Sequence, residues 1–222
     1  LIIGYPLAVV EDTLRSVGDL FIVKKVKAED YLELLSLLYA ILRSVKGQGM
    51  LQLENMIERP HESELFQQYP RVLANPRAVN FLCDYLRLLS LGTAKPHEIE
   101  SLMDEEIRIL SKDLHRPTHA LQVIADALPA LGIVAAVLGV IRAMGAINQP
   151  PEVLGHLIGG ALFGTFIGVF LSYGVVSPLA GLVRTNKDAQ ISYFLAIKST
   201  LLAHLNGAAA QVAIEYGRKV LH

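Results

Sequence analysis

The chain has 222 residues, of which 52% are hydrophobic, and its mean hydropathy of +0.42 is high for a soluble domain. The formal net charge is −1, so the chain lacks the basic excess with which proteins bind nucleic acid. A single cysteine, Cys83, excludes an internal disulfide, and its apolar helical surroundings favour a packing role over a reactive thiol.

The first ten residues, LIIGYPLAVV, are apolar and end at the acidic pair Glu11-Asp12. Ten residues are too few to cross a bilayer. Neither a basic segment nor a small-residue cleavage site accompanies them, so they do not predict a signal peptide. We interpret residues 1–10 as a fragment of an N-terminal transmembrane helix, and the abrupt change after Val10 is consistent with residues missing there.

Residues 11–116 place apolar and charged side chains at helical spacing, which predicts a compact, all-helical domain outside the membrane. One apolar stripe runs from Tyr31 to Val45, and the glycines that follow at 47 and 49 predict the end of that helix. A short helical pattern then covers residues 51–57.

Two proline-containing signals predict the next helices of this domain. Asn75-Pro76 predicts a helix start, because asparagine caps the first turn and proline fits its first position, and Gly92 predicts its end. Pro96 predicts a further helix with acidic residues in its early turns, which suits the helix dipole. Its acidic run 104–106 favours a solvated helix face, with a docking surface for a basic partner as the alternative.

A first transmembrane span is predicted over residues 117–143. Pro117 predicts a break and Thr118 a new cap, after which the chain becomes apolar over Ala127–Ile141. Asp126 lies close to one interface of this span. Its small residues predict a close-packing face; they are Gly132, Ala136, Gly139 and Ala143.

A second transmembrane span is predicted over residues 157–183, which contain no charged residue and are long enough to cross a bilayer even when tilted. Glycines four apart, at 160, 164 and 168, predict a face on which another helix packs closely. Pro178 removes a backbone donor and predicts a kink.

The link over residues 144–156 is short, so the two spans are predicted to form a hairpin. Lysine and arginine are sparse in the link and abundant in both flanks, which predicts a periplasmic link and cytoplasmic flanks. Residues 184–222 are predicted to form a C-terminal cytoplasmic helix that packs on the preceding domain. The predicted fold class is an all-α, polytopic membrane protein with a helical cytoplasmic domain.

The sequence contains no motif typical of a catalytic, nucleotide or metal site. It has no phosphate-binding loop, no HExxH pair and no CxxC. His115 and His119 are four apart, but Pro117 lies between them and no third ligand is evident, so surface histidines are favoured. We therefore predict no enzyme activity, no catalytic residue, no bound metal and no cofactor.

Neither predicted span has a carboxylate at its centre, although proton and sodium pathways usually need one. If the chain conducts an ion, the titrating acid must therefore come from another chain. Thr165 is the best-placed local polar group for lining such a path. The alternative is that its hydroxyl bonds back to a carbonyl of its own helix.

Several characteristic segments occur in order from about residue 29 to the end: MLQLENMIERPHESELF, YPRVLA, DYLRLLSLG, EIESLMDEEI, ADALPALGIVAAVLGV, LGHLIGGALFGTFIGVFLSYGVVSPLA and LNGAAAQVAIEYGRKVL. They resemble the flagellar motor stator proteins of the MotA/TolQ/ExbB proton channel family. The resemblance implies a multi-pass subunit of the bacterial inner membrane that forms a homo-oligomer, with five copies around two MotB partners. In that family an aspartate of MotB carries the ion. The family has four spans, of which only the last two are complete here.

The resemblance also implies roles for individual residues of the spans. Pro129 and Pro178 match the two channel prolines that couple ion passage to shape change, and Thr165 matches the channel threonine that faces the MotB acid. Ala136 stands where sodium-driven relatives carry threonine. Because a methyl group offers no oxygen ligand to a hard cation, we predict that the transported ion is the proton.

Lys46 and Glu54 match the cytoplasmic charges that contact the rotor protein FliG. Most relatives carry arginine at the first of these places, and lysine keeps the charge but lacks the planar fork. Two alternatives stay open at this point. One is a proton-channel energiser of the ExbB/TolQ type that drives an outer-membrane process, and the other is a membrane scaffold without ion flux.

Overall fold

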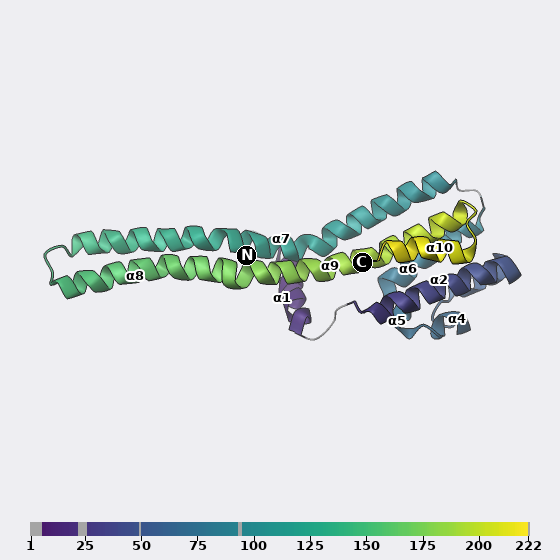
Figure 1. The fold of residues 1–222 in the computed structure, drawn as a ribbon, viewed down its shortest axis with the longest axis horizontal. Coiled ribbons are helices and arrows are strands. Elements are labelled where there is room, and N and C mark those ends of the chain that lie inside the picture. Colours follow the sequence, from purple (N-terminus) through teal and green to yellow (C-terminus); the bar gives the residue numbers. More distant parts are fainter. Residues whose placement is uncertain (1–5, 22–25, 49, 93–94, 222) are drawn as a thin grey trace. The chain divides into compact units, whose positions relative to one another are not determined.

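The computed structural model describes residues 6–21, 26–48, 50–92 and 95–221, with the side chains at 20–21, 46–48, 50–52 and 55 outside that description (Figure 1). All regular structure in these ranges is helical, as predicted. The helices are α1 (Leu7–Phe21), α2 (Ala28–Gln48), α3 (Met50–Glu58), α4 (Glu64–Gln67), α5 (Pro70–Leu73), α6 (Pro76–Ser90), α7 (Pro96–Gly145), α8 (Pro151–Val169), the π-helix η1 (Phe170–Val176), α9 (Ser177–Leu205) and α10 (Ala210–Lys219).

Two compact units share these helices. The hairpin unit consists of Leu1–Lys24 and Leu114–Thr185, and the helical domain consists of Lys25–Asp113 and Asn186–His222. Each unit therefore takes part of α7 and part of α9.

The helical domain has a continuous apolar core. Leu34, Leu38 and Ile41 of α2 are at most 1% exposed, and α2 packs against α3, α5 and α10. Phe81 of α6 meets Phe194 of α9 edge to face, with ring centroids 5.3 Å apart. The C-terminal part of the chain thus completes this core, as its amphipathic pattern predicts.

Local sequence signals set several helix boundaries in this domain. The Asn75 side chain accepts a hydrogen bond from the backbone N–H of Ala78 at 3.3 Å, and Pro76 is the first residue of α6. Gly92 follows α6 with φ of +66°, a value that glycine adopts without strain. These caps and the start of α7 at Pro96 confirm the predictions.

The prediction of one helix over residues 184–222 was wrong. α9 ends at Leu205 and α10 begins at Ala210, and between them Gly207 adopts φ of +88°. A left-handed glycine just past a helix end redirects the chain. The turn lets α10 pack back on α2.

The predicted break at Pro117 was also wrong, since α7 continues through both Pro117 and Pro129. An internal proline removes one helical hydrogen bond and crowds the preceding turn, but the bonds on either side can hold a long helix together. The first predicted span is therefore the C-terminal part of one 50-residue helix.

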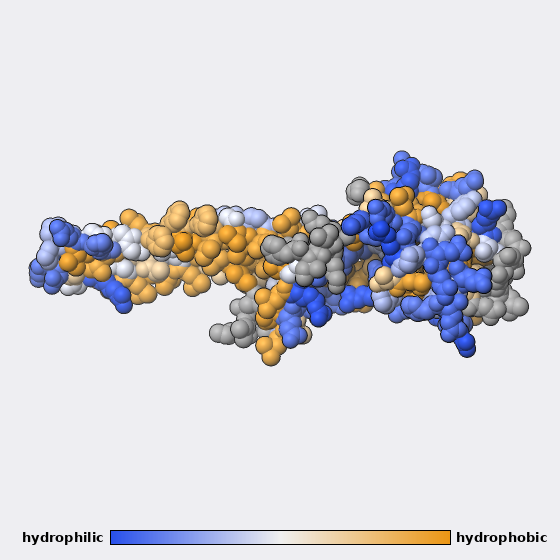
Figure 2. Space-filling view, turned by 90° about the horizontal axis from the view of Figure 1, so that it is seen from below, coloured by the Kyte–Doolittle hydropathy of each residue, from blue (hydrophilic) through white to orange (hydrophobic). Residues whose placement is uncertain are grey.

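In the hairpin unit, α7 and α8 lie side by side and the chain reverses over residues 146–150, a shorter link than the predicted 144–156 (Figure 1). In the described residues, Pro96–Gly145 and Pro151–Leu205 are the two helical stretches long and apolar enough to cross a membrane. Figure 2 shows hydrophobic residues along much of the hairpin surface. Exposed examples are Leu131, Val137, Ile141, Leu162, Phe166 and Phe170.

α1 belongs to the hairpin unit, whereas we predicted that the helical domain begins at residue 11. The physical reason is that Val17 packs against an apolar cluster formed by Leu121, Ala180 and Val183. Of the predicted N-terminal fragment, residues 1–5 lie outside the described residues and residues 7–10 open α1. That these residues come from a transmembrane helix stays a prediction.

Candidate functional site

Glycines bring the two spans into backbone contact along a line that we call the seam. A Cβ atom added to Gly168 would lie 2.7 Å from the carbonyl oxygen of Leu128, and one added to Gly132 would lie 2.9 Å from that of Gly164. Gly139 approaches Ala161 in the same way. Gly160, predicted on this face, has open space around it in the described chain. The seam therefore uses Ala161 rather than Gly160.

Three of the four predicted channel residues gather along this seam. Pro129 and Ala136 lie three and four residues from Gly132 on α7, on the side that faces α8, and all of them are at least half-buried. The Thr165 hydroxyl of α8 lies 3.5 Å from the Gly132 carbonyl oxygen, a long hydrogen bond across the hairpin. Its contact is thus with the neighbouring span and not with its own helix.

Pro178 stands apart from those three residues. It is exposed near the start of α9, 13 positions after Thr165, which corresponds to roughly 20 Å along a helix. Immediately before it, the chain forms the π-helix η1, in which the N–H of Ser177 donates to the carbonyl of Ser172. Because Pro178 cannot donate to the carbonyl of Gly174, a wider turn suits this position.

The seam has no acid at its centre. Asp126 is exposed one turn before Pro129, and its carboxylate accepts a hydrogen bond of 2.9 Å from the Gln122 amide. No Asp or Glu lies between Ala127 and Ile141 or between Leu157 and Val183. Thr165 is thus a polar group in a wall that contains no carboxylate.

The two predicted rotor-contact residues lie on successive helices of the helical domain. Lys46 belongs to α2, but its side chain lies outside the described part of the chain. Glu54 is exposed on α3, whereas its neighbours Leu53 and Ile57 are buried. A charge at Glu54 is therefore presented to solvent.

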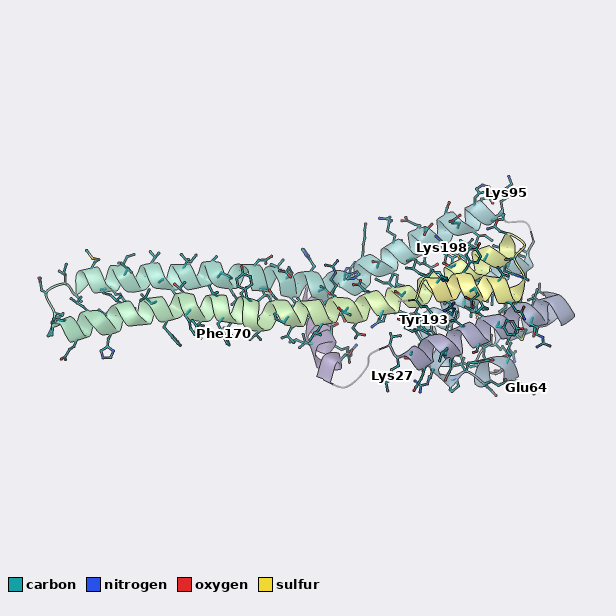
Figure 3. The ribbon with its side chains drawn as sticks, viewed as in Figure 1. Lys27, Glu64, Lys95, Phe170, Tyr193 and Lys198 are labelled. Atoms are coloured by element: carbon teal, nitrogen blue, oxygen red, sulfur yellow. The ribbon has the colours of Figure 1, made fainter. Side chains whose placement is uncertain are left out.

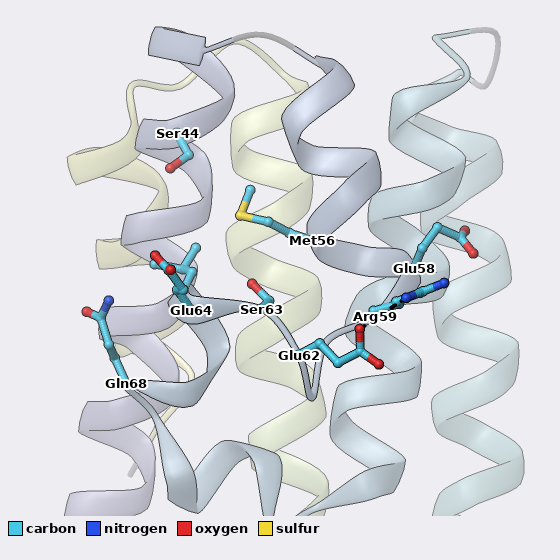
Figure 4. Close-up of a pocket in the computed structure, with 9 residues that line it drawn as sticks. Ser44, Met56, Glu58, Arg59, Glu62, Ser63, Glu64 and Gln68 are labelled. Atoms are coloured by element: carbon cyan, nitrogen blue, oxygen red, sulfur yellow. Dashed lines mark hydrogen bonds and ion pairs between the residues drawn. The ribbon is translucent and has the colours of Figure 1, made fainter.

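A surface cavity of about 780 Å³ opens close to α3. Figure 4 shows Ser44 of α2, Met56 of α3 and Glu64 of α4 around it. Its other acids have partners in the chain: Glu58 contacts Arg87 at 3.0 Å, and Glu62 contacts Arg59 at 3.2 Å. Among the described side chains that line this cavity, Glu54 is not present.

The acidic run on α7 is engaged within the domain. Asp104 pairs with Lys198 of α9 at 2.5 Å, Glu105 pairs with Arg108, and Glu106 accepts a hydrogen bond of 2.8 Å from the Tyr85 hydroxyl. Figure 3 labels Lys198, whose side chain is only 15% exposed. Asp104 and Glu106 thus join α7 to α9 and α6, whereas Glu105 pairs within α7.

Sequence patterns did not indicate an ion-pair cluster between α2 and α5. Arg71 contacts Asp30 at 3.1 Å and Glu33 at 3.2 Å and also pairs with Glu29. The Glu33 carboxylate additionally accepts a hydrogen bond from the backbone N–H of Arg71 at 3.0 Å. The spacing of these acids, on one face of α2, is the signal that could have indicated a shared cation.

The remaining candidates carry no reactive chemistry. Burial raises the pKa of the Cys83 thiol to about 12, which keeps it protonated and confirms its packing role. Within the described ranges, no three histidine, cysteine or acidic side chains come together as metal ligands.

Comparisons with known proteins agree over the whole length. The family model for MotA/TolQ/ExbB proton channels matches residues 77–195, and the model for the N-terminal part of motility protein A matches residues 1–49. The chain is 42% identical to motility protein A of Salmonella typhimurium and 43% identical to that of Escherichia coli, covering 100% of this chain and 75% of each relative. It is 35% identical to chemotaxis protein LafT of Vibrio parahaemolyticus, over 99% of this chain and 77% of that protein.

Solved structures share the fold. The MotAB structure from C. jejuni matches with a TM-score of 0.76 at 18% identity, covering 100% of this chain and 78% of that one. The flagellar MotAB stator complex from Bacillus subtilis matches with a TM-score of 0.66 at 20% identity, covering 96% and 76%. Together with the apolar hairpin and the full-length identity to motility protein A, these matches show that the chain belongs to the MotA/TolQ/ExbB proton channel family.

Proposed function

We propose that the chain is a stator subunit of the bacterial flagellar motor that conducts protons with MotB and applies torque to the rotor protein FliG. The observation that carries this proposal is the 42% identity to a motility protein A over the entire chain. The relatives are named for motility and chemotaxis, which favours a motor function over the ExbB/TolQ alternative.

The acid-free seam supports a shared ion path. A proton that crosses the membrane needs a titratable carboxylate within it, and the apolar parts of α7 and α8 contain none. An aspartate of MotB would supply it, facing Thr165 and flanked by Pro129 and Ala136. The methyl group of Ala136 offers no oxygen ligand to sodium, so the transported ion is the proton.

The exposed apolar surface of the hairpin supports an assembly in lipid. Side chains such as Leu131, Leu162 and Phe166 are about 60% exposed in the single chain. In the complex they would contact membrane lipid, the MotB helices and other copies of the chain. Five copies in all would surround the two MotB partners. The protein would lie in the inner membrane with its helical domain in the cytoplasm.

The helical domain would transmit torque from the complex to the rotor. Proton binding changes the charge of the MotB acid, and the surrounding spans move past it. Lys46 and Glu54, on α2 and α3, would then press on charges of FliG. A channel subunit of this kind performs mechanical work with ion flow and needs no catalytic residue or cofactor.

Complementation tests the proposal. The chain is expressed with its own MotB-type partner in a bacterium deleted for its stators, and swimming speed is measured. Restored swimming that fails without the partner is the expected result. A complex that assembles in the membrane but restores no rotation, while energising an outer-membrane process in a strain deleted for ExbB and TolQ, would overturn it.

A further inference from the structure

Pro129 leaves a backbone carbonyl of α7 without its helical partner. In an α-helix the carbonyl of residue 125 accepts from the N–H of residue 129, and proline has no N–H. Ala125 is 0% exposed, so water in the surroundings of the chain does not reach it. An unpaired carbonyl in such a place is costly, above all within a membrane.

Ser172 supplies the missing donor. Its hydroxyl donates a hydrogen bond of 2.6 Å to the Ala125 carbonyl oxygen, across the hairpin, and Ser172 is 1% exposed. Serine in an apolar helix commonly bonds back to its own helix, yet here the bond goes to the neighbouring span. The hydroxyl and the carbonyl are both buried, so this contact is formed within the single chain and needs no partner.

Two local features bring Ser172 into reach. Gly168, one turn earlier, lets α8 approach so closely that an added Cβ would lie 2.7 Å from the Leu128 carbonyl oxygen. Ser172 itself lies within η1, the π-helical segment before Pro178. A π-helix changes the rotation of side chains about the axis, so the segment around Pro178 helps to aim the hydroxyl at the carbonyl that Pro129 exposes.

We infer that Ser172 is a positioning residue that clamps the two spans by occupying the carbonyl freed by Pro129, and that this clamp couples the proline to the motion of the hairpin. The inferred coupling of Pro129 to hairpin motion rests on the proposed stator function, whereas the hydrogen bond itself does not depend on that function. If the two spans move during ion passage, the hydrogen bond between Ser172 and the Ala125 carbonyl must either break or stay intact while both spans move together. Its loss therefore loosens the link between ion passage and movement.

A double-mutant cycle tests the hydrogen bond. The full-length chain is purified in complex with its MotB-type partner, and its unfolding equilibrium in detergent is measured for Ser172→Ala, Pro129→Ala and the double variant. We expect Ser172→Ala to shift the equilibrium about threefold toward unfolding, the average for hydrogen bonds between membrane helices. In the Pro129→Ala background, Ser172→Ala should leave the unfolding equilibrium unchanged, because the new backbone N–H at position 129 donates to the Ala125 carbonyl.

Matched variants keep this cycle interpretable. Ser177→Ala removes a hydroxyl five residues further along the same helix and should leave the equilibrium unchanged. If Ser172→Ala does not assemble, Ser172→Thr, which keeps the hydroxyl, is compared with Ser172→Val, which has the same shape without it. The clamp is overturned if Ser172→Ala shifts the unfolding equilibrium equally with and without Pro129→Ala. It is also overturned if the Ser172→Thr and Ser172→Val complexes have the same unfolding equilibrium.

Proton flux and torque test the positioning role. In complexes present at equal amounts, Ser172→Ala should raise the proton flux per unit of torque by about threefold, the same factor as the lost hydrogen bond, and Ser172→Thr should restore it. An unchanged ratio would overturn the coupling even if the cycle shows the hydrogen bond. If the unaltered complex turns no motor, the proposed function fails, while the unfolding cycle still decides the clamp.

Discussion

Gly168 and Gly160 look equivalent in the sequence, but the structure predicts opposite responses to alanine. A Cβ at Gly168 would lie 2.7 Å from the Leu128 carbonyl oxygen and 3.0 Å from the Cα of Gly132. Both contacts are backbone atoms, so neither can rotate away, and the helices must separate. A Cβ at Gly160 meets nothing within 4 Å in the described chain.

The magnitude follows from this overlap. Forcing one extra carbon into a packed seam costs about 1–3 kcal/mol. Separation at Gly168 would also weaken the contacts of Ser172 and Thr165, which lie within one turn of it. Gly168→Ala should therefore lower the free energy of unfolding by about 2 kcal/mol, and Gly160→Ala should leave it nearly unchanged.

The assay is the fraction of detergent-solubilised complex that stays assembled as temperature or denaturant rises, measured for both variants against the unaltered complex. Equal losses for the two variants, as expected if glycines 160, 164 and 168 formed one packing face, would refute the assignment of the seam. A stable Gly168→Ala complex would refute the close approach of the helices at that level.

Three further outcomes are expected. Reversing both predicted rotor-contact charges in one variant, by Lys46→Glu together with Glu54→Lys, should slow motor rotation while proton flux through the complex stays unchanged, as measured by bead rotation and by cytoplasmic pH. Arg71→Ala should lower the melting temperature of the complex, more at low than at high salt, because three carboxylates of α2 lose their shared cation; Arg59→Ala, which removes a single exposed ion pair, is the control. Burial holds the Cys83 pKa at about 12, above its ordinary value of 9.0, so its contribution to stability is present below pH 9 and should fade toward pH 12; the Cys83→Ala variant should show a flatter pH profile of unfolding in that range.

The sequence was sufficient for features set by local chemistry. The Asn75 cap, the proline start of α7 and the end of α6 before Gly92 each depend on one residue type in one backbone geometry. The hairpin followed from the length of two apolar stretches and the shortness of their link.

Features set by contacts between distant residues were not predictable. Proline at 117 is typical of a helix break, but whether a long helix tolerates it depends on packing along both sides. The register of the seam decided that Ala161, and not Gly160, meets α7. The acceptor for Ser172 is 47 residues away, so its role appeared only once the helices were paired.

The channel residues were identified by resemblance, and the structure gives three of them a physical setting. Pro129, Ala136 and Thr165 lie on either side of one seam, whereas Pro178 is exposed further along, beside a π-helical turn that no sequence pattern indicated. Their roles in ion passage, and the contact of Lys46 and Glu54 with the rotor, stay predictions.

The most direct measurement is the cytoplasmic pH of cells that express this chain alone, its MotB-type partner alone, or both together with the partner's plug removed. Because the seam contains no acid of its own, acidification is expected only when both are present, and it should vanish when the partner's membrane aspartate is replaced by asparagine. Acidification by this chain alone would contradict the account.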